Sequence, residues 1–209
     1  LTDTGRVKHS LEEHFSQELT VLPIPHIPDI KGKPEEKSDR ISCWWPGGAR
    51  EGKGQKIIER LCFESQTDRD KLHIFVNEEL AAPVTNPITF LPSHLSREAY
   101  TEMMKQTDFV LLPYIDKSYQ NSSSGIFLEA VMSKKIPLVY PNTWMAYELK
   151  KYGLEDLILN WEREDICTHI ASLYRNPIYQ KKLDQMHDEY QKFHNMDSFA
   201  KTFQTLLLK

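Results

Sequence analysis

The 209-residue sequence contains no apolar run close to the about 20 residues that a helix needs to cross a bilayer. The sequence, which begins at Leu1, also lacks the apolar core of a signal peptide at its N-terminus. We therefore expect a cytoplasmic protein. A peripheral position on the cytoplasmic face of a membrane remains open.

Cysteine and excess positive charge are also scarce. The three cysteines, Cys43, Cys62 and Cys167, are widely spaced and each lies in an apolar context, which favours buried thiols over disulfides or metal ligands. Lys and Arg number 26 against 30 Asp and Glu, a net charge of −4, which argues against general nucleic-acid binding. Hydrophobic residues make up 40% and charged residues 27%, which argues against wholesale disorder.

From Ile41 onward, short apolar runs alternate with segments of helical periodicity. The predicted strands are 41–45, 72–76, 88–92, 109–112, 136–140 and 157–159. Helices are predicted after Gly54, after Ser96 as a cap, over 126–132, from Trp144 with Asn142-Thr143 as the cap, over 166–173, from Pro177 and from Asp197. This alternation with short loops favours a parallel sheet covered on both faces. The predicted fold is thus an α/β, Rossmann-like domain over residues 38–209.

Residues 1–30 do not resemble the start of a domain. Ser10-Leu11-Glu12-Glu13 is a capping-box pattern that predicts the start of a short helix. Residues 19–22 read as a strand, the prolines of 23–28 require an extended chain, and 31–40 is charged like a surface linker. We interpret residues 1–37 as the tail of a preceding domain plus a linker.

The stretch 110–149 carries the first functional signal. Pro113 ends the strand 109–112, and a polar loop then closes on Ser122-Ser123-Ser124-Gly125 before the next helix. Such a loop leaves the free N–H groups of a helix N-terminus at the carboxyl edge of a parallel sheet, where anions bind. On pattern alone, an ordinary βαβ unit with a serine-rich turn explains the stretch equally well.

The second signal is the loop 46–54, which contains four glycines in nine residues. Glycine permits positive φ and close approach of the backbone to a ligand. Arg50 offers a planar fork of donors and Lys53 a point charge, a combination that suits a diphosphate. The loop is neither a Walker A sequence nor GxGxxG, and two solvated surface charges are the alternative interpretation.

Together, the two stretches resemble the donor-binding, C-terminal domain of GT-B glycosyltransferases of the retaining, family-4 (group 1) type. The motifs that carry the resemblance are Gly47-Gly48-Ala49-Arg50-Glu51-Gly52-Lys53-Gly54, Leu112-Pro113-Tyr114, Ser124-Gly125-Ile126-Phe127-Leu128-Glu129-Ala130 and Lys135-Ile136-Pro137-Leu138-Val139. The resemblance extends over nearly the whole chain and is sharpest at 47–54 and 111–149. In that family a Pro-Ile-Pro segment such as 23–25 leads out of the N-terminal, acceptor-binding domain.

The resemblance implies a nucleotide-diphosphate sugar as donor substrate and hexosyl transfer as the reaction. Arg50 and Lys53 would be the catalytic residues, stabilising the leaving diphosphate. The residues implied in donor binding are Gly48, Leu91, Pro92, Ser123, Ser124, Gly125, Ile126 and Glu129. Of these, Gly125 and Ile126 would donate backbone N–H groups, Glu129 would accept from the ribose hydroxyls, and Leu91 and Pro92 would flank the base. A surface position is the alternative for Glu129.

Neither a metal nor another cofactor is implied, because no Asp-x-Asp occurs in a suitable loop and cationic residues can replace a metal. His187 and His194 lack acidic or cysteine partners at ligand spacing, and we expect them at the surface. The sequence departs from the family pattern at Asn121, where many members carry glutamate, and at Ser122, where the variant closest to this chain often has arginine.

These departures leave two alternatives open: a sugar-nucleotide epimerase of the same fold, and a degenerate GT-B domain that acts as a non-catalytic binding module. The acceptor, whether glycan, lipid or protein, would be held by an N-terminal domain that this sequence does not include. We therefore expect the chain by itself to bind the donor without transferring sugar.

Overall fold

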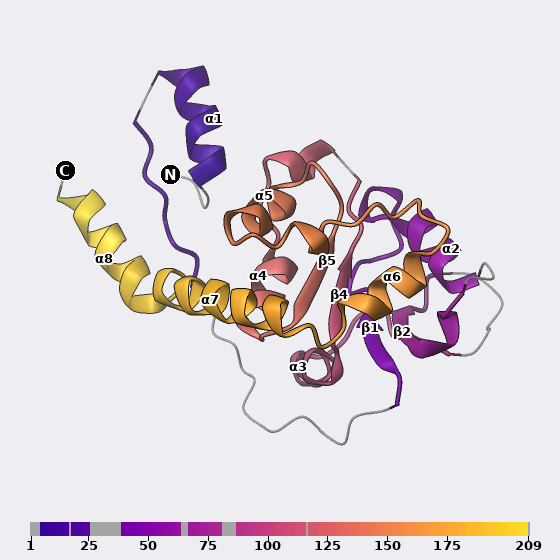
Figure 1. Cartoon of the computed structure of the whole chain (residues 1–209). Coiled ribbons are helices and arrows are strands. Elements are labelled where there is room, and N and C mark those ends of the chain that lie inside the picture. The colour runs from indigo at the N-terminus through magenta and orange to yellow at the C-terminus, as the bar shows by residue number, and fades with distance from the viewer. Residues whose placement is uncertain are drawn as a thin grey trace.

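The computed structural model describes residues 5–16, 18–25, 39–63, 67–80, 87–115 and 117–208. Its centre is a five-stranded, fully parallel sheet with the strand order β3-β2-β1-β4-β5 (Figure 1). The strands are β1 (Ile41–Trp44), β2 (Leu72–Asn77), β3 (Ile88–Leu91), β4 (Phe109–Leu112) and β5 (Ile136–Val139). The predicted α/β, Rossmann-like architecture is confirmed.

Eight α-helices are present in the described residues. They are α1 (Gly5–Phe15), α2 (Gln55–Phe63), α3 (Arg97–Gln106), α4 (Gly125–Met132), α5 (Trp144–Lys151), α6 (Ile166–Leu173), α7 (Pro177–Phe193) and α8 (Met196–Leu207). Short 3-10 turns add η1 (Glu51–Lys53), η2 (Arg69–Lys71), η3 (Lys117–Gln120) and η4 (Glu155–Leu157). Figure 1 shows α2 and α6 on one side of the sheet and α3, α4 and α7 on the other.

The strands consist mostly of apolar residues, because helices cover both faces of the sheet and leave few strand side chains in contact with solvent. All four residues of β4 are buried, so this strand lacks the alternation of a half-exposed sheet. Large side chains such as Trp45 and Trp161 are also completely enclosed. All three cysteines are buried and none forms a disulfide, as predicted. Burial raises the pKa of the Cys62 thiol to about 12, which keeps it protonated and unreactive.

Helix starts follow the predicted capping chemistry at several sites. The Ser96 hydroxyl accepts from the Ala99 N–H at 3.2 Å, and Thr143 accepts from the Ala146 N–H at 3.1 Å. Each bond satisfies one of the N–H groups that have no acceptor within the first turn. Pro177 is the first residue of α7, where its missing N–H costs nothing.

Two predictions in the N-terminal segment are wrong. Helix α1 begins at Gly5, a turn before Ser10, because half-buried Val7 and Leu11 extend its apolar face toward the N-terminus. The predicted strand 19–22 is reduced to a single bridge residue, Val21, and the Leu19 N–H donates to the Glu12 carboxylate at 2.7 Å.

The predicted strand 157–159 is reduced to one parallel bridge between Ile158 and Val139. The reason is η4, whose turn takes up the N–H groups of Leu157 and Ile158. Only the Leu159 N–H continues toward the sheet, donating to the Val139 carbonyl at 3.0 Å. The last helix starts at Met196, one residue earlier than predicted, because Asn195 caps it.

The two histidines expected at the surface are buried. His187 is 7% exposed and His194 8%. His194 Nδ1 lies 3.1 Å from the Ile24 carbonyl, so this side chain connects α7 to the segment that follows α1. Residues 31–38 of the predicted linker, and with them the predicted domain boundary, lie outside the described residues.

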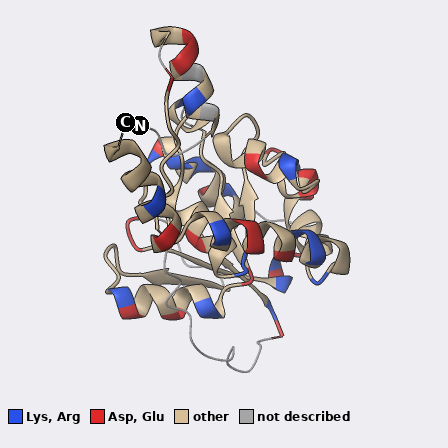
Figure 2. Ribbon diagram, turned by 90° about the vertical axis from the view of Figure 1, so that its left-hand side faces the viewer, with Lys and Arg blue, Asp and Glu red and all other residues tan. Residues whose placement is uncertain are grey.

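Helix α8 carries an apolar face that is largely exposed, with only Phe199 and Leu206 half-buried. Phe203 and Leu207 are 42% and 71% exposed, and α8 has no buried residue. Figure 1 shows α1 and α8 on the same side of the molecule. Acidic and basic residues are interspersed over the side shown in Figure 2. No helix among the described residues combines the length and apolarity needed to cross a bilayer.

Burial predicts opposite outcomes for two leucines. Leu138 in β5 is 0% exposed, so Leu138→Ala should lower the free energy of unfolding by about 2–5 kcal/mol. Leu207 is 71% exposed, so Leu207→Ala should change it by no more than about 0.5 kcal/mol. Urea unfolding followed by circular dichroism measures both, and equal losses would contradict the assignment of core and surface.

Candidate functional site

The order of the strands reverses between β1 and β4, which lie next to each other with Cys43 opposite Phe109 and Trp44 opposite Val110. The crevice outside the carboxyl ends of such a pair is where open α/β sheets bind ligands. The loop 46–54 leaves β1 at this point, and the loop 113–124 leaves β4. The topology therefore brings both loops singled out in the sequence to one edge of the sheet.

The two loops are in direct contact. The Ile115 N–H donates to the Gly52 carbonyl at 3.1 Å. Gly54 has φ of 81°, and a Cβ added to it would lie 2.2 Å from the Pro113 carbonyl oxygen. Only glycine permits both this backbone conformation and this approach. Gly54 thus fixes how closely the two loops meet.

Lys53 lies at the junction of the loops and is half-buried. Its Nζ is 5.5 Å from the centre of the Tyr114 ring, and its carbonyl accepts from Trp45 Nε1 at 3.2 Å. Burial, and secondarily the positive charge of Arg50, lowers the pKa of Lys53. Arg50 itself is exposed, directly before η1. The site therefore holds two cations whose mutual repulsion an anion would relieve.

Tyr114, the residue after Pro113, is 1% exposed. Burial raises the pKa of its phenol. Its hydroxyl has no hydrogen-bond partner among the described protein groups. A buried hydroxyl without a partner is costly, and a water or a ligand atom would satisfy it.

Helix α4 presents its N-terminus at the same edge. Ser124 is the N-cap, and its hydroxyl accepts from the Phe127 N–H at 3.3 Å. Gly125 is exposed, Ile126 and Ser123 are half-buried. The first N–H groups of a helix have no acceptor within it, which gives this end the partial positive charge that suits an anion. The Ser124 oxygen is committed to capping the helix, while its O–H remains a possible donor.

Glu129, one turn into α4, is bound by two side chains of α3. Tyr100 donates its hydroxyl to Glu129 Oε2 at 2.5 Å, and Arg97 Nη1 lies 3.3 Å from Oε1. The side chain of Glu129 is 28% exposed. Burial and this hydrogen bond raise the pKa of Tyr100, so the phenol stays protonated and remains the donor.

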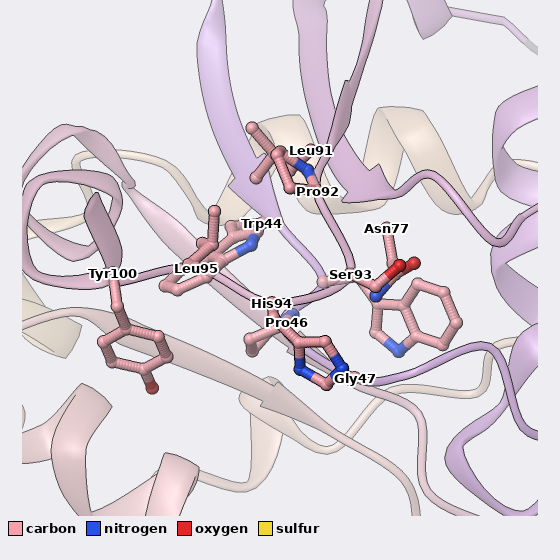
Figure 3. A pocket seen from close by; sticks show the side chains of 11 residues that line it. Trp44, Pro46, Gly47, Asn77, Leu91, Pro92, Ser93, His94, Leu95 and Tyr100 are labelled. Atoms are coloured by element: carbon pink, nitrogen blue, oxygen red, sulfur yellow. The ribbon is translucent and has the colours of Figure 1, made fainter. Parts of the chain in front are cut away.

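A cavity of about 160 Å³ opens at the carboxyl ends of β1, β2 and β3 (Figure 3). Its lining residues are Trp44, Trp45, Pro46, Gly47, Asn77, Leu91, Pro92, Ser93, His94, Leu95 and Tyr100. Leu91 and Pro92, which the resemblance places beside a base, are among them. Gly48 is not, since the glycine in the wall is its neighbour Gly47.

Several of these residues were not selected from the sequence. Trp44 and Asn77 are the last residues of β1 and β2, and the carboxyl ends of parallel strands are where ligands gather. That positional rule could have identified them. Arg97 and Tyr100 had no such signal, because the sequence does not show that α3 and α4 lie side by side.

The two departures from the family pattern, Asn121 and Ser122, are exposed and follow η3. Both of their N–H groups donate to the Ser118 carbonyl, so they form a turn at the rim of the site. Within the described ranges, no three His, Cys, Asp or Glu side chains are arranged to hold a metal ion.

No protein-family model and no curated protein sequence matches the chain. Solved structures do match it. WaaG, a glycosyltransferase involved in lipopolysaccharide biosynthesis, is 17% identical with a TM-score of 0.60, over 94% of this chain and 58% of WaaG. OtsA, a trehalose-6-phosphate synthase, is 13% identical with a TM-score of 0.64, and the match covers 92% of this chain and 51% of OtsA. The spinosyn forosaminyltransferase SpnP is 12% identical with a TM-score of 0.62, and the match covers 92% of this chain and 52% of SpnP.

This chain therefore has the fold of the C-terminal domain of GT-B glycosyltransferases. At these identities the likeness concerns the fold alone. The match covers between 51% and 58% of each of those three chains, so this chain spans little more than half of their length.

The close approach of the two loops can be tested at Gly54. Gly54→Ala should lower the free energy of unfolding by at least about 2 kcal/mol, because it combines a positive φ with a backbone clash. Gly48→Ala is the matched control in the same loop. The nearest atom to its added Cβ is Arg50 Nε at 3.9 Å, so we expect a change below about 1 kcal/mol. Similar urea midpoints for both variants would refute the contact.

Proposed function

We propose that this chain is the donor-binding half of a glycosyltransferase and binds a nucleotide-diphosphate sugar at the edge of the sheet between β1 and β4. The observation that carries the proposal is the contact between the loops 46–54 and 113–124. This contact holds the two cations at the edge of the sheet at which helix α4 also begins, so that both loops would contribute to one anion site. The fold shared with WaaG and OtsA supports it.

The chemistry to be assisted is departure of a nucleoside diphosphate from the anomeric carbon. Negative charge grows on the diphosphate as the glycosidic bond breaks, and fixed positive groups stabilise that charge best. Arg50 and Lys53 would supply the charges, and Gly125 and Ile126 would donate backbone N–H groups, with Ser123 and Ser124 as further donors. Lys53 is half-buried in the unliganded protein, so its desolvation precedes binding.

The nucleoside would occupy the adjoining cavity. Leu91 and Pro92 line it and would flank the base, while Trp44 and Trp45 close its floor. Tyr100 lines the same cavity and binds Glu129. Glu129 would therefore lie beside the ribose, whose vicinal hydroxyls offer two donors to one carboxylate.

The acceptor would be held by a further domain, since this chain spans little more than half of the matched structures. We infer that the chain alone binds the donor without transferring sugar, and that the complete protein is a cytoplasmic hexosyltransferase. The cationic residues would do the work of a metal, so no cofactor is required. A complex of this chain with its acceptor-binding half should restore transfer.

A non-catalytic binding module is the second candidate. It is favoured by Asn121 and Ser122, which place neutral side chains at the rim of the site, where family members often carry a glutamate and an arginine. The two candidates share donor binding. Product formation by the complete protein, tested with a panel of nucleotide sugars, separates them.

Binding of UDP, GDP or ADP, measured by isothermal titration calorimetry up to millimolar concentration, tests the proposal. We expect at least one to bind, and Arg50→Gln to weaken it about 10- to 100-fold through loss of a charge-assisted hydrogen bond. Arg175→Gln is the control, because Arg175 lies far from the site. Its guanidinium stacks on Tyr174, whose ring centre is 6.2 Å from that of Phe109, at the end of β4 opposite to the site. Absence of binding, or equal effects of both variants, would refute the proposal.

The lowered pKa of Lys53 predicts how diphosphate affinity depends on pH. The protonated amine binds the anion, so affinity should be full below the pKa of Lys53 in the free protein and fall as pH rises through it. The fall should begin below the ordinary lysine value of about 10.4. Lys53→Arg should abolish this fall, since guanidinium keeps its charge above pH 12. Calorimetry between pH 7 and 10 measures both proteins, and identical profiles would exclude Lys53 from the site.

A further inference from the structure

We propose that Arg97 and Tyr100 are positioning residues that make Glu129 a selector of ribonucleotides over 2′-deoxyribonucleotides. The inference rests on the proposed function, because it assigns the recognition of the ribose at that same site. It assigns a role in that function to two residues of α3, a helix that lies outside all of the sequence motifs described above.

The arrangement assigns one donor to each oxygen of the Glu129 carboxylate. Tyr100 donates to Oε2 at 2.5 Å, a short charge-assisted bond, and Arg97 approaches Oε1 at 3.3 Å. Two donors on different oxygens restrict rotation of the carboxylate plane. The direction of the remaining lone pairs is therefore fixed before any ligand arrives.

The carboxylate retains capacity for a ligand. An ionised carboxylate has about four acceptor sites, and α3 uses one on each oxygen. The remaining two match the two hydroxyls of a vicinal diol, which a 2′-deoxyribose lacks. The side chain of Glu129 is 28% exposed, so these sites remain accessible.

Tyr100 is itself held from two sides. Its ring packs edge-on against Trp44 at 5.0 Å between ring centres, and the Arg97 guanidinium lies 5.8 Å from its centre. Trp44 is the last residue of β1 and is 2% exposed, so the phenol is anchored to the centre of the sheet. In Figure 3 its hydroxyl points away from the other labelled side chains, while the ring forms part of the cavity wall. One side chain thus connects the cavity to the carboxylate.

A purely structural role does not account for Arg97. Arg97 is 56% exposed, and an exposed ion pair contributes little to stability because solvent screens it. Helix α3 already has its N-cap at Ser96 and a buried face through Met104. What the two donors add is a defined direction of the Glu129 oxygens, which matters only to a ligand that binds them.

The test compares ribo- and 2′-deoxyribonucleoside diphosphates on the wild-type chain and on Tyr100→Phe and Arg97→Gln variants. The probe is the tightest binder among UDP, GDP and ADP, paired with its 2′-deoxy form, and calorimetry gives both affinities. We expect the wild type to prefer the ribonucleotide about tenfold, the typical gain from one added hydrogen bond. Tyr100→Phe should weaken ribonucleotide binding about three- to tenfold and the deoxy form less, because the deoxy form offers Glu129 only its 3′-hydroxyl. Arg97→Gln should do the same to a smaller extent, and Arg97→Lys should restore most of the preference.

Three outcomes overturn the inference. If Tyr100→Phe weakens both nucleotides equally, Tyr100 acts through packing or the base. If the variant tightens binding, the α3 side chains compete with the ligand for Glu129. If the wild type binds both sugars equally, Glu129 does not read the ribose, although the chain still binds a nucleotide. If no nucleotide binds the wild type, the proposed function fails first. Arg97 is exposed, so Arg97→Gln provides a folded variant should Tyr100→Phe prove unstable.

Discussion

The close approach of Gly54 to Pro113 is the constraint on which the site depends. Pro113 ends β4 and turns the chain out of the sheet, and Gly54 supplies the positive φ that lets the neighbouring loop reach it. Because β1 and β4 are adjacent at the reversal of strand order, the loops that follow them leave the sheet side by side at its carboxyl edge. The cations of one loop and the helix N-terminus behind the other are consequently at the same edge of the sheet.

This geometry has an electrostatic consequence. Lys53 lies half-buried beside Tyr114, where desolvation lowers its pKa and the nearby Arg50 adds repulsion. An unliganded site of this kind stores unfavourable electrostatic energy that a bound anion releases. The folding energy that brings Gly54 against Pro113 therefore also preorganises the cations, so an anion that bound there would require less reorganisation of the site.

Local signals predicted the sheet and the loops well, because each depends on a few neighbouring residues. The apolar quartets, the caps at Ser96 and Thr143 and the break at Pro113 are all local. Predictions failed where a distant group decided the outcome. The Glu12 carboxylate accepts from the Leu19 N–H, and the Ile24 carbonyl lies 3.1 Å from His194 Nδ1. The contact of α3 with Glu129 was not foreseen for the same reason, since 29 positions separate Tyr100 from Glu129.

The dependence of Glu129 on α3 also links the parts of the site to one another. The Tyr100 ring forms part of the cavity wall and its hydroxyl binds the carboxylate, while Glu129 belongs to the helix that begins after the loop 113–124. A ligand long enough to reach from the cavity to the cations would contact the ends of β1, β3 and β4 through one rigid set of side chains. Rigid sets of this kind bind extended ligands with little loss of conformational entropy. Under the proposed function, a nucleoside diphosphate would place a flat base, a diol and an anionic end in that order along this edge of the sheet.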